Sequence, residues 1–240
     1  MAKTNSIELP GCEPIPILFE DRSVLAIDKP RGWMLVPHSW QRTSRNLQAA
    51  INSSIAGGDF WARSRGLKFL RNVHRLDADT SGILLFAKSP GAVDVISDLF
   101  EDRRMEKVYL AVVTGQPKQA EWSCQLRLAP DPKKFGRMMV DAREGKEAET
   151  RFKIGDKRGD FTLVEARPVT GRTHQIRVHL AECGLPIIGD ELYGQKDARL
   201  PLGLRAVRLS FTNPFTKEPV DIHAPQDEFL RQYGFGALKK

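Results

Sequence analysis

The feature that most constrains the fold is a series of short apolar runs with only a few turn residues between them. Residues 23–28 and 33–36 form one such pair, and residues 149–154 and 161–169 form another. Closely spaced runs of this length are typical of β-hairpins, whereas parallel strands need a long crossover, usually a helix. We therefore predict an α+β fold with a mixed, largely antiparallel central sheet and flanking helices, and not an alternating βαβ fold.

Helical periodicity is confined to a few segments. Ser89 and Pro90 provide a cap and a first position, and apolar residues then recur at helical spacing to about Arg103. Another helix is expected from Thr173 to Gly184. With 41% hydrophobic residues in 240, and no repeat or linker, we expect one domain over residues 12–236 after a flexible leader over residues 1–11.

The net charge of +7 is modest, but its placement is informative. The stretch from residue 61 to 75 contains five basic residues and no acid, and residues 131–145 form a polar, basic loop or ribbon. Clustered Lys and Arg suit a phosphate backbone, because binding releases condensed counterions. A solvated face explains such clusters about as well, so charge alone does not establish RNA binding.

The cysteines and the apolar runs indicate the compartment. Cys12, Cys124 and Cys183 are far apart and odd in number, which argues against a disulfide framework and a zinc site. No apolar run is long enough to span a membrane, and residues 1–10 are no secretory signal. We therefore expect a cytoplasmic protein with reduced thiols and no membrane association.

Asp77 lies in the segment His74–Gly82, directly before the apolar run 83–87. A carboxylate in a turn beside Arg75 and small hydroxyl residues can act as a nucleophile or as a general acid or base. Taken alone, the pattern favours an Asx-turn, in which Asp77 or Asp79 only bonds nearby backbone amides.

The segment 171–179 offers a partner for a carboxylate. If Thr173 caps the helix, His174 and Arg177 lie on one side of it, and Arg177 can point into a cleft and pair with an acid. A surface ion pair is the plainer alternative. His174 and His179 are five apart, a poor spacing for two metal ligands on one helix face, so structural roles are expected for them.

Tyr109 lies on an expected strand. Alternation places it with Lys107 and Ala111 on one face, while the more apolar face carries Val108, Leu110 and Val112. Tyr109 is thus turned away from the most apolar face, although a strand aromatic more often serves packing than chemistry.

Together these segments resemble the RluA-type pseudouridine synthases. His74-Arg75-Leu76-Asp77 followed by Thr80-Ser81-Gly82 is similar to the signature of that family. Further segments match in the same order over residues 15–225: Lys29-Pro30 with Gly32, Lys107-Val108-Tyr109, Gly145-Lys146 with Ala148 and Thr150, Gly171 to His179, and Gly189-Asp190 with Tyr193-Gly194.

The resemblance implies the pseudouridine synthase fold and the isomerisation of uridine to pseudouridine in ribosomal or transfer RNA. A monomer is the default expectation, since the sequence does not indicate an oligomeric state. Asp77 matches the essential aspartate, and Tyr109 matches the tyrosine that stacks on the target base. Arg177 matches the basic residue that pairs with the aspartate, and Arg75 the arginine that helps to hold the RNA or to replace the flipped base. The reaction conserves atoms, so no cofactor or metal is expected.

Two features depart from the family pattern. Leu204-Arg205-Ala206 stands where the family often has Leu-His-Ala, and nothing before Cys12 could form an S4-like RNA-binding domain. Two other functions stay open: a non-catalytic RNA-binding or ribosome-assembly protein, and a glycoside hydrolase that uses Asp77 and Asp79. A glycoside hydrolase needs a defined distance between its two carboxyl groups, and two acids that lie two residues apart in a turn would not provide one.

Overall fold

The structure is a computed structural model that describes residues 3–35, 45–194 and 200–236. The chain forms two compact units. Unit 1 comprises Met1–Met105 with Leu209–Ala224, and unit 2 comprises Glu106–Arg208 with Pro225–Lys240. Strand β12 (Leu204–Thr212) contributes residues to both. No described helix is long and apolar enough to cross a membrane. The single domain expected from the sequence stays a prediction.

Unit 1 is built on an antiparallel sheet with the strand order β1-β2-β3-β5. The strands span Ser6–Ile7, Ile15–Glu20, Val24–Lys29 and Ser81–Ala87. β4 (Arg71–Asn72) pairs with β5, and β13 (Pro219–His223) pairs with β12. Every residue of β5 is buried, as its continuous apolar run predicts.

Two segments of unit 1 differ from the expectation. The flexible leader expected at residues 1–11 contains β1, because Ile7 and Leu9 bury their side chains. The strand expected at residues 33–36 is absent from its described part, where Met34 forms a single bridge with Asn46. The preceding turn does not fold back as a hairpin, since the Gly32 N–H donates to Ala78 O at 2.8 Å.

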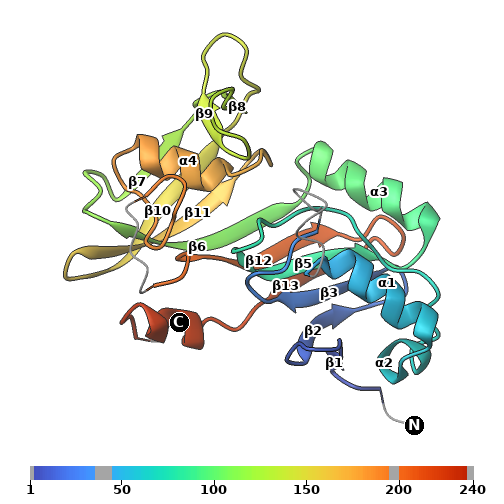
Figure 1. Ribbon diagram of the computed structural model, residues 1–240. Coiled ribbons are helices and arrows are strands. Elements are labelled where there is room, and N and C mark those ends of the chain that lie inside the picture. The colour runs from blue at the N-terminus through green and yellow to red at the C-terminus, as the bar shows by residue number, and fades with distance from the viewer. Residues whose placement is uncertain (1–2, 36–44, 195–199, 237–240) are drawn as a thin grey trace. The chain divides into compact units, whose positions relative to one another are not determined.

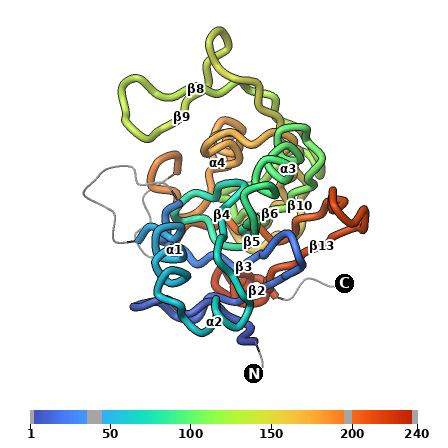
Figure 2. The backbone as a smooth tube through the Cα atoms, turned by 90° about the vertical axis from the view of Figure 1, so that its right-hand side faces the viewer, coloured from blue at the N-terminus to red at the C-terminus, as the bar shows by residue number. Residues whose placement is uncertain are grey.

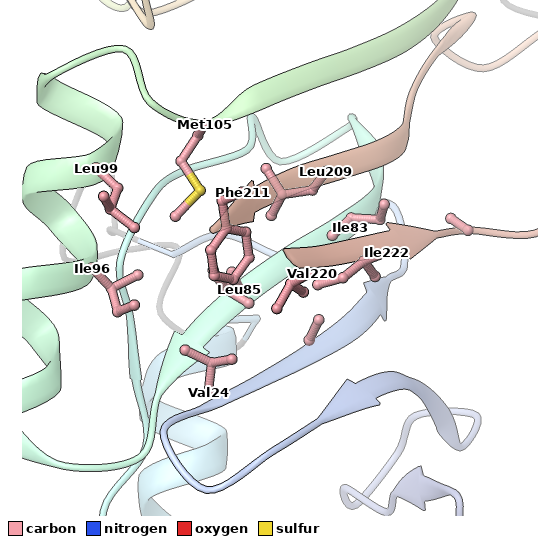
Figure 3. Close-up of a cluster of buried hydrophobic side chains, with 12 residues drawn as sticks. Val24, Ile83, Leu85, Ile96, Leu99, Met105, Leu209, Phe211, Val220 and Ile222 are labelled. Atoms are coloured by element: carbon pink, nitrogen blue, oxygen red, sulfur yellow. The ribbon is translucent and has the colours of Figure 1, made fainter. Parts of the chain in front are cut away.

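The described residues of unit 1 include the helices α1 (Leu47–Gly57), α2 (Phe60–Arg63) and α3 (Pro90–Glu101). Ser89 caps α3 by accepting the Ala92 N–H, which confirms the predicted start. Figure 3 shows the core on this side of the sheet, where the α3 side chains Ile96 and Leu99 meet residues of β3, β5, β12 and β13. Burial of these apolar groups is the main stabilising contribution to unit 1.

Unit 2 contains an antiparallel sheet with the order β6-β11-β10-β7. Its strands span Glu106–Thr114, Phe161–Pro168, Thr150–Arg158 and Glu121–Cys124. α4 (Gln175–Glu182) lies along β10 and β11 (Figure 1), and α5 (Asp227–Gln232) contributes to a second core. The predicted α+β class with flanking helices is confirmed.

The two faces of β6 are both covered, which the sequence pattern did not indicate. Val108, Leu110 and Val112 pack with residues of α5, so the predicted core face is confirmed. Ala111 and Val113 on the opposite face are also buried, in a cluster with α4 residues. The face that carries Tyr109 is therefore a second packed face, and Tyr109 itself lies half-buried at its margin.

The basic segment after β7 forms a two-stranded ribbon, β8 (Leu128–Pro130) paired with β9 (Met138–Val140). This hairpin extends beyond α4, away from the sheet of unit 2 (Figures 1 and 2). Its base is close-packed, because a Cβ added at Gly145 would lie 2.3 Å from Asp141 O. The predicted loop or ribbon is confirmed as a ribbon, and Gly145 is the residue that its base requires.

Candidate active site

The four predicted site residues are divided between the units: Arg75 and Asp77 belong to unit 1, and Tyr109 and Arg177 to unit 2. Asp77 begins a turn that leads into β5, closed by the Thr80 N–H donating to Asp77 O at 3.2 Å. The neighbouring Leu76 and Thr80 are buried, whereas Arg75 is exposed and Asp77 half-buried. The turn is thus anchored on both sides of a partly accessible carboxylate.

Lys29 holds this turn from inside unit 1. Its side chain is fully buried, and Nζ donates to the carbonyl oxygens of Pro30, Ala78 and Thr80 at 3.0, 2.8 and 3.0 Å. Two of these carbonyls belong to the Asp77 turn. The Lys29-Pro30 segment matches the family pattern, and in the structure it fixes the backbone that carries Asp77.

The charge of Lys29 is part of the same arrangement. Burial lowers the pKa of Lys29 to about 8, and the nearby carboxylates of Asp77 and Asp79 oppose this shift. Three carbonyl acceptors match the three donors of an ammonium group, so the buried charge has a complete set of partners. The ammonium thus lies close enough to Asp77 to interact with it electrostatically.

His74 fixes the start of the same segment. Its Nε2 accepts the Leu85 N–H at 2.9 Å, and its ring stacks on Phe100 with centroids 4.6 Å apart. An accepting Nε2 places the proton of a neutral ring on Nδ1. The histidine of the His-Arg-Leu-Asp segment therefore has a structural role, between β5 and α3.

Arg177 on α4 forms a buried bidentate ion pair with Asp190. The Nε–Oδ2 and Nη2–Oδ1 distances are 2.7 and 2.8 Å, and the two side chains are 8% and 0% exposed. Burial alone would raise the pKa of Asp190, but hydrogen bonds from Arg177 and from the amides of Leu192 and Tyr193 hold it below its usual range. Asp190 thereby fixes the orientation of the guanidinium. The pairing of Arg177 with Asp77 stays a prediction.

Tyr193 connects Arg177 with the β8–β9 hairpin. Its Oη accepts the Met138 N–H at 2.7 Å and hydrogen bonds with His174 Nδ1 at 2.8 Å. Its ring faces the guanidinium groups of Arg177 and Arg137, whose Cζ atoms lie 5.2 and 5.4 Å from its centroid. His174 and Arg177 therefore lie on one side of the helix, as predicted, and both contact Tyr193.

The start of α4 corrects one prediction. Its N-cap is His174, with φ 55, and not Thr173, and no side chain caps the helix. Gln175 organises this segment instead: its Oε1 accepts from Thr170 Oγ1 at 2.6 Å and from the Arg172 N–H at 2.9 Å. The left-handed backbone at His174 turns its ring toward Tyr193.

His179 is structural, as expected. Its side chain is fully buried, Nδ1 hydrogen bonds with Thr150 Oγ1 at 3.0 Å, and Nε2 with Leu126 O at 3.1 Å. Burial lowers the pKa of His179. Among the described residues, no group of three or more His, Cys, Asp and Glu side chains is placed to hold a metal ion.

Lys107 precedes Tyr109 on the same face of β6. Its Nζ donates to Thr170 O at 3.2 Å, and burial lowers the pKa of Lys107 to about 8. Thr170 directly precedes the segment 171–179, so Lys107 ties the strand of Tyr109 to the segment that carries Arg177. In the segment Lys107-Val108-Tyr109, Lys107 therefore has a structural role, and Tyr109 provides the aromatic ring.

Two basic residues have different surroundings from those expected. Arg65, one of the five in the basic stretch, turns inward and donates to Glu20 at 2.9 Å, whereas Arg63, Lys68, Arg71 and Arg75 are exposed. Arg205, where the family often has histidine, is buried and donates to Pro225 O at 2.9 Å. The sequence indicated neither contact, because the partners lie 45 and 20 residues away.

Comparison with known proteins identifies the family of the chain. The family model described as RNA pseudouridylate synthase matches residues 23–182, which include Lys29, Asp77, Tyr109 and Arg177. Ribosomal large subunit pseudouridine synthase C from Escherichia coli K12 is 38% identical over 227 residues, covering 90% of this chain and 68% of that protein. The protein of the same name from Yersinia pestis is 39% identical over 224 residues.

Two solved structures share this fold. Human RNA Pseudouridylate Synthase Domain Containing 1 superposes with a TM-score of 0.70 at 25% identity, covering 90% of this chain and 85% of that one. Human RNA Pseudouridylate Synthase Domain Containing 4 has the same TM-score at 22% identity and shares the fold. The chain belongs to the RNA pseudouridylate synthase family, within its RluA-type members.

Proposed function

We propose that this RNA pseudouridine synthase acts on the RNA of the large ribosomal subunit and uses Asp77 as its catalytic residue. The observation that best supports Asp77 is its turn: Lys29 and His74 hold the turn in place, while the carboxylate stays partly accessible. The substrate follows from the similarity to proteins named ribosomal large subunit pseudouridine synthase C. The proposal includes a monomeric enzyme in the cytoplasm.

The chemistry explains why a carboxylate is needed. Pseudouridine formation breaks the N1–C1′ bond of uridine, rotates the uracil and joins its C5 to C1′, after which the C5 proton leaves. A carboxylate assists either by attacking a carbon covalently or by removing the C2′ proton to give a glycal. Both routes need Asp77 in a fixed position, since small displacements of a reacting group are costly in rate.

The remaining residues bind the nucleotide. Flipping a base out of its stack costs a few kcal/mol, and stacking on Tyr109 offsets about 1–3 kcal/mol of this. Arg75, exposed two residues before Asp77, holds the backbone or occupies the place of the flipped base. Arg177 matches the basic residue that serves the catalytic aspartate in the family, and the orientation of its guanidinium is set by Asp190.

The test is tritium release from large-subunit ribosomal RNA labelled with [5-³H]uridine and transcribed in vitro, so that it carries no modification. The wild-type chain should release tritium, and Asp77→Asn should release none while its circular dichroism and unfolding curve stay close to wild type. Asp79→Asn is the matched control, since Asp79 is an exposed acid two residues away, and it should retain activity.

The possible outcomes distinguish the assignment of Asp77 from the proposed substrate. Full activity of Asp77→Asn would refute the assignment of Asp77. Equal losses in Asp77→Asn and Asp79→Asn would indicate a pair of carboxylates in place of a single catalytic aspartate. Release from transfer RNA and not from ribosomal RNA would overturn the proposed substrate and leave Asp77 in place.

A further inference from the structure

The tip of the β8–β9 hairpin carries an unusual side chain. Phe135 is 88% exposed, far more than the other large hydrophobic residues that are exposed in the described part of the chain. Single exposed apolar side chains are ordinary on protein surfaces, so exposure by itself says little. The surroundings of Phe135 distinguish it from the others.

Cations surround Phe135 on this tip. Lys133 and Lys134 precede it and are exposed, and Arg137 follows it. The one carboxylate of the tip, Asp131, is used within the turn: Oδ1 accepts the Lys133 N–H at 2.9 Å, and Oδ2 lies 3.9 Å from Arg137 Nη1. The tip therefore presents an aromatic ring within a positively charged surface.

The tip is also well ordered by its own backbone. Asp131 N–H donates to Arg137 O at 2.9 Å, Arg137 N–H donates to Lys134 O at 3.1 Å, and Gly136 supplies the left-handed conformation with φ 77. Three backbone hydrogen bonds close this seven-residue turn, the third from Lys134 N–H to Asp131 O. A ring presented on an ordered turn loses little conformational entropy when it binds.

The base of the hairpin is joined to a predicted site residue. Met138 N–H donates to Tyr193 Oη, and the Tyr193 ring faces both Arg137 and Arg177. Asp190, which orients Arg177, also accepts the Tyr193 N–H at 3.1 Å. The hairpin and Arg177 thus share one supporting side chain within unit 2.

We propose that Phe135 stacks on an unpaired base of the substrate RNA beside the target uridine, while Lys133 and Lys134 contact the flanking phosphates. Base stacking on an aromatic side chain within a positive surface is the common chemistry of single-stranded RNA binding. A protein partner would need a contiguous apolar patch, and Phe135 is a single ring among cations. The proposal rests on the proposed function and adds a residue that requires an unpaired base near the target uridine.

Binding of the unmodified large-subunit ribosomal RNA transcript tests this directly, by filter binding at several salt concentrations. Phe135→Ala should weaken binding about 5- to 150-fold, the range that loss of one stacked base produces. Phe135→Trp should bind like wild type, and Phe135→Leu should bind like Phe135→Ala, because only an aromatic face stacks. Phe215→Ala, which removes a 50% exposed phenylalanine from a turn of unit 1, is the matched control and should change nothing.

Salt dependence separates stacking from charge. Phe135→Ala should keep the wild-type slope of log K against log salt, whereas Lys133→Ala and Lys134→Ala should each reduce that slope by about 1. Wild-type affinity in Phe135→Ala, or equal affinities of the Leu and Trp variants, would overturn the stacking role.

A photo-cross-link locates the base. With p-benzoylphenylalanine at position 135, irradiation should join the hairpin to an unpaired nucleotide within a few positions of the pseudouridine, and the same group at position 215 should give no such product. Cross-links only at scattered duplex sites would overturn the proposal. If wild type binds the transcript and cross-links through position 135 but releases no tritium, the proposed catalytic function fails while the stacking contact stands.

Discussion

At the scale of single residues, the catalytic turn depends on a buried charge. Lys29 is fully buried, and its ammonium group donates to the carbonyl oxygens of Pro30, Ala78 and Thr80. A methionine of similar length would fill the same space without a donor. The carbonyls of Pro30, Ala78 and Thr80 would then lack this partner, and unsatisfied buried acceptors are costly.

We predict that Lys29→Met lowers the free energy of unfolding by about 2–4 kcal/mol at pH 7 and lowers kcat about tenfold or more. The loss of kcat follows from the freed Asp77 turn. Urea unfolding and tritium release would measure the two effects. A variant with wild-type kcat would show that the clamp serves stability alone.

The same variant should reveal the titration of Lys29. The pKa of Lys29 is about 8 in the folded chain, and its ordinary value of 10.5 applies to the unfolded chain. Between these two pH values the unfolded chain therefore binds more protons than the folded chain. Wild-type stability therefore rises with pH across that window, and the Lys29→Met chain lacks this contribution. The difference in free energy of unfolding should grow by about 3 kcal/mol from pH 7 to pH 11. A constant difference would contradict the lowered pKa.

At the scale of elements, Tyr193 is the connection between α4 and the β8–β9 hairpin. Its hydroxyl holds Met138 of β9 and His174 at the start of α4, while its ring faces Arg177. Phenylalanine keeps the ring and removes only the hydroxyl. The hairpin would therefore lose this hydrogen bond, while its apolar packing on Val178 and the contact of the ring with Arg177 remained.

We predict that Tyr193→Phe speeds hydrogen exchange in β8 and β9 and raises KM for RNA several-fold, with kcat within about twofold of wild type. Tyr233→Phe is the matched control, because its hydroxyl donates to Pro201 O at 2.9 Å in the same unit but away from the hairpin. A fall in kcat without a change in KM would show that Tyr193 acts on the chemistry through His174 or Arg177.

At the scale of the whole molecule, each unit has a carboxylate paired with cationic side chains: the half-buried Glu20 in unit 1 pairs with Lys88 and Arg65, and the buried Asp190 in unit 2 pairs with Arg177. In unit 1, burial would raise the pKa of Glu20, but hydrogen bonds from Lys88 and Arg65 lower it. In unit 2, Arg177 and two amides lower the pKa of Asp190 against the effect of burial. Carboxylates of this kind stabilise the fold above their ordinary pKa, and the contribution is lost as pH falls through the folded value.

We predict that the stability of each unit falls at acid pH, because each unit depends on one of these two carboxylates. Asp190→Asn should lower the free energy of unfolding by about 3–5 kcal/mol at pH 7, because it leaves a buried guanidinium without its charge partner. The difference from wild type should shrink as pH falls below the ordinary value of 3.8, because the unfolded wild-type chain takes up a proton on Asp190 there before the folded chain does. Hydrogen exchange should place the effect of Asp190→Asn in unit 2 and that of Glu20→Gln in unit 1. A difference that persists to pH 2 would contradict the ion pair.

The sequence by itself determined the elements and the type of chemistry. Local signals were sufficient for α3, where Ser89 and Pro90 mark the start, and for the buried β5 and the β10–β11 hairpin. The ordered motifs were sufficient for the family and for placing Asp77 before a strand. These features depend on residues close together in the chain, where periodicity and capping carry the information.

Only the tertiary structure decided which groups support the site. Lys29 reaches Thr80 across 51 positions, Arg177 reaches Asp190 across 13, and Tyr193 reaches Met138 across 55. The inward turn of Arg65, the cap at His174 and the covered face of Tyr109 were likewise settled by packing. Side chains distant in the chain find their partners through burial, because a buried polar group must be satisfied wherever its partner lies in the sequence.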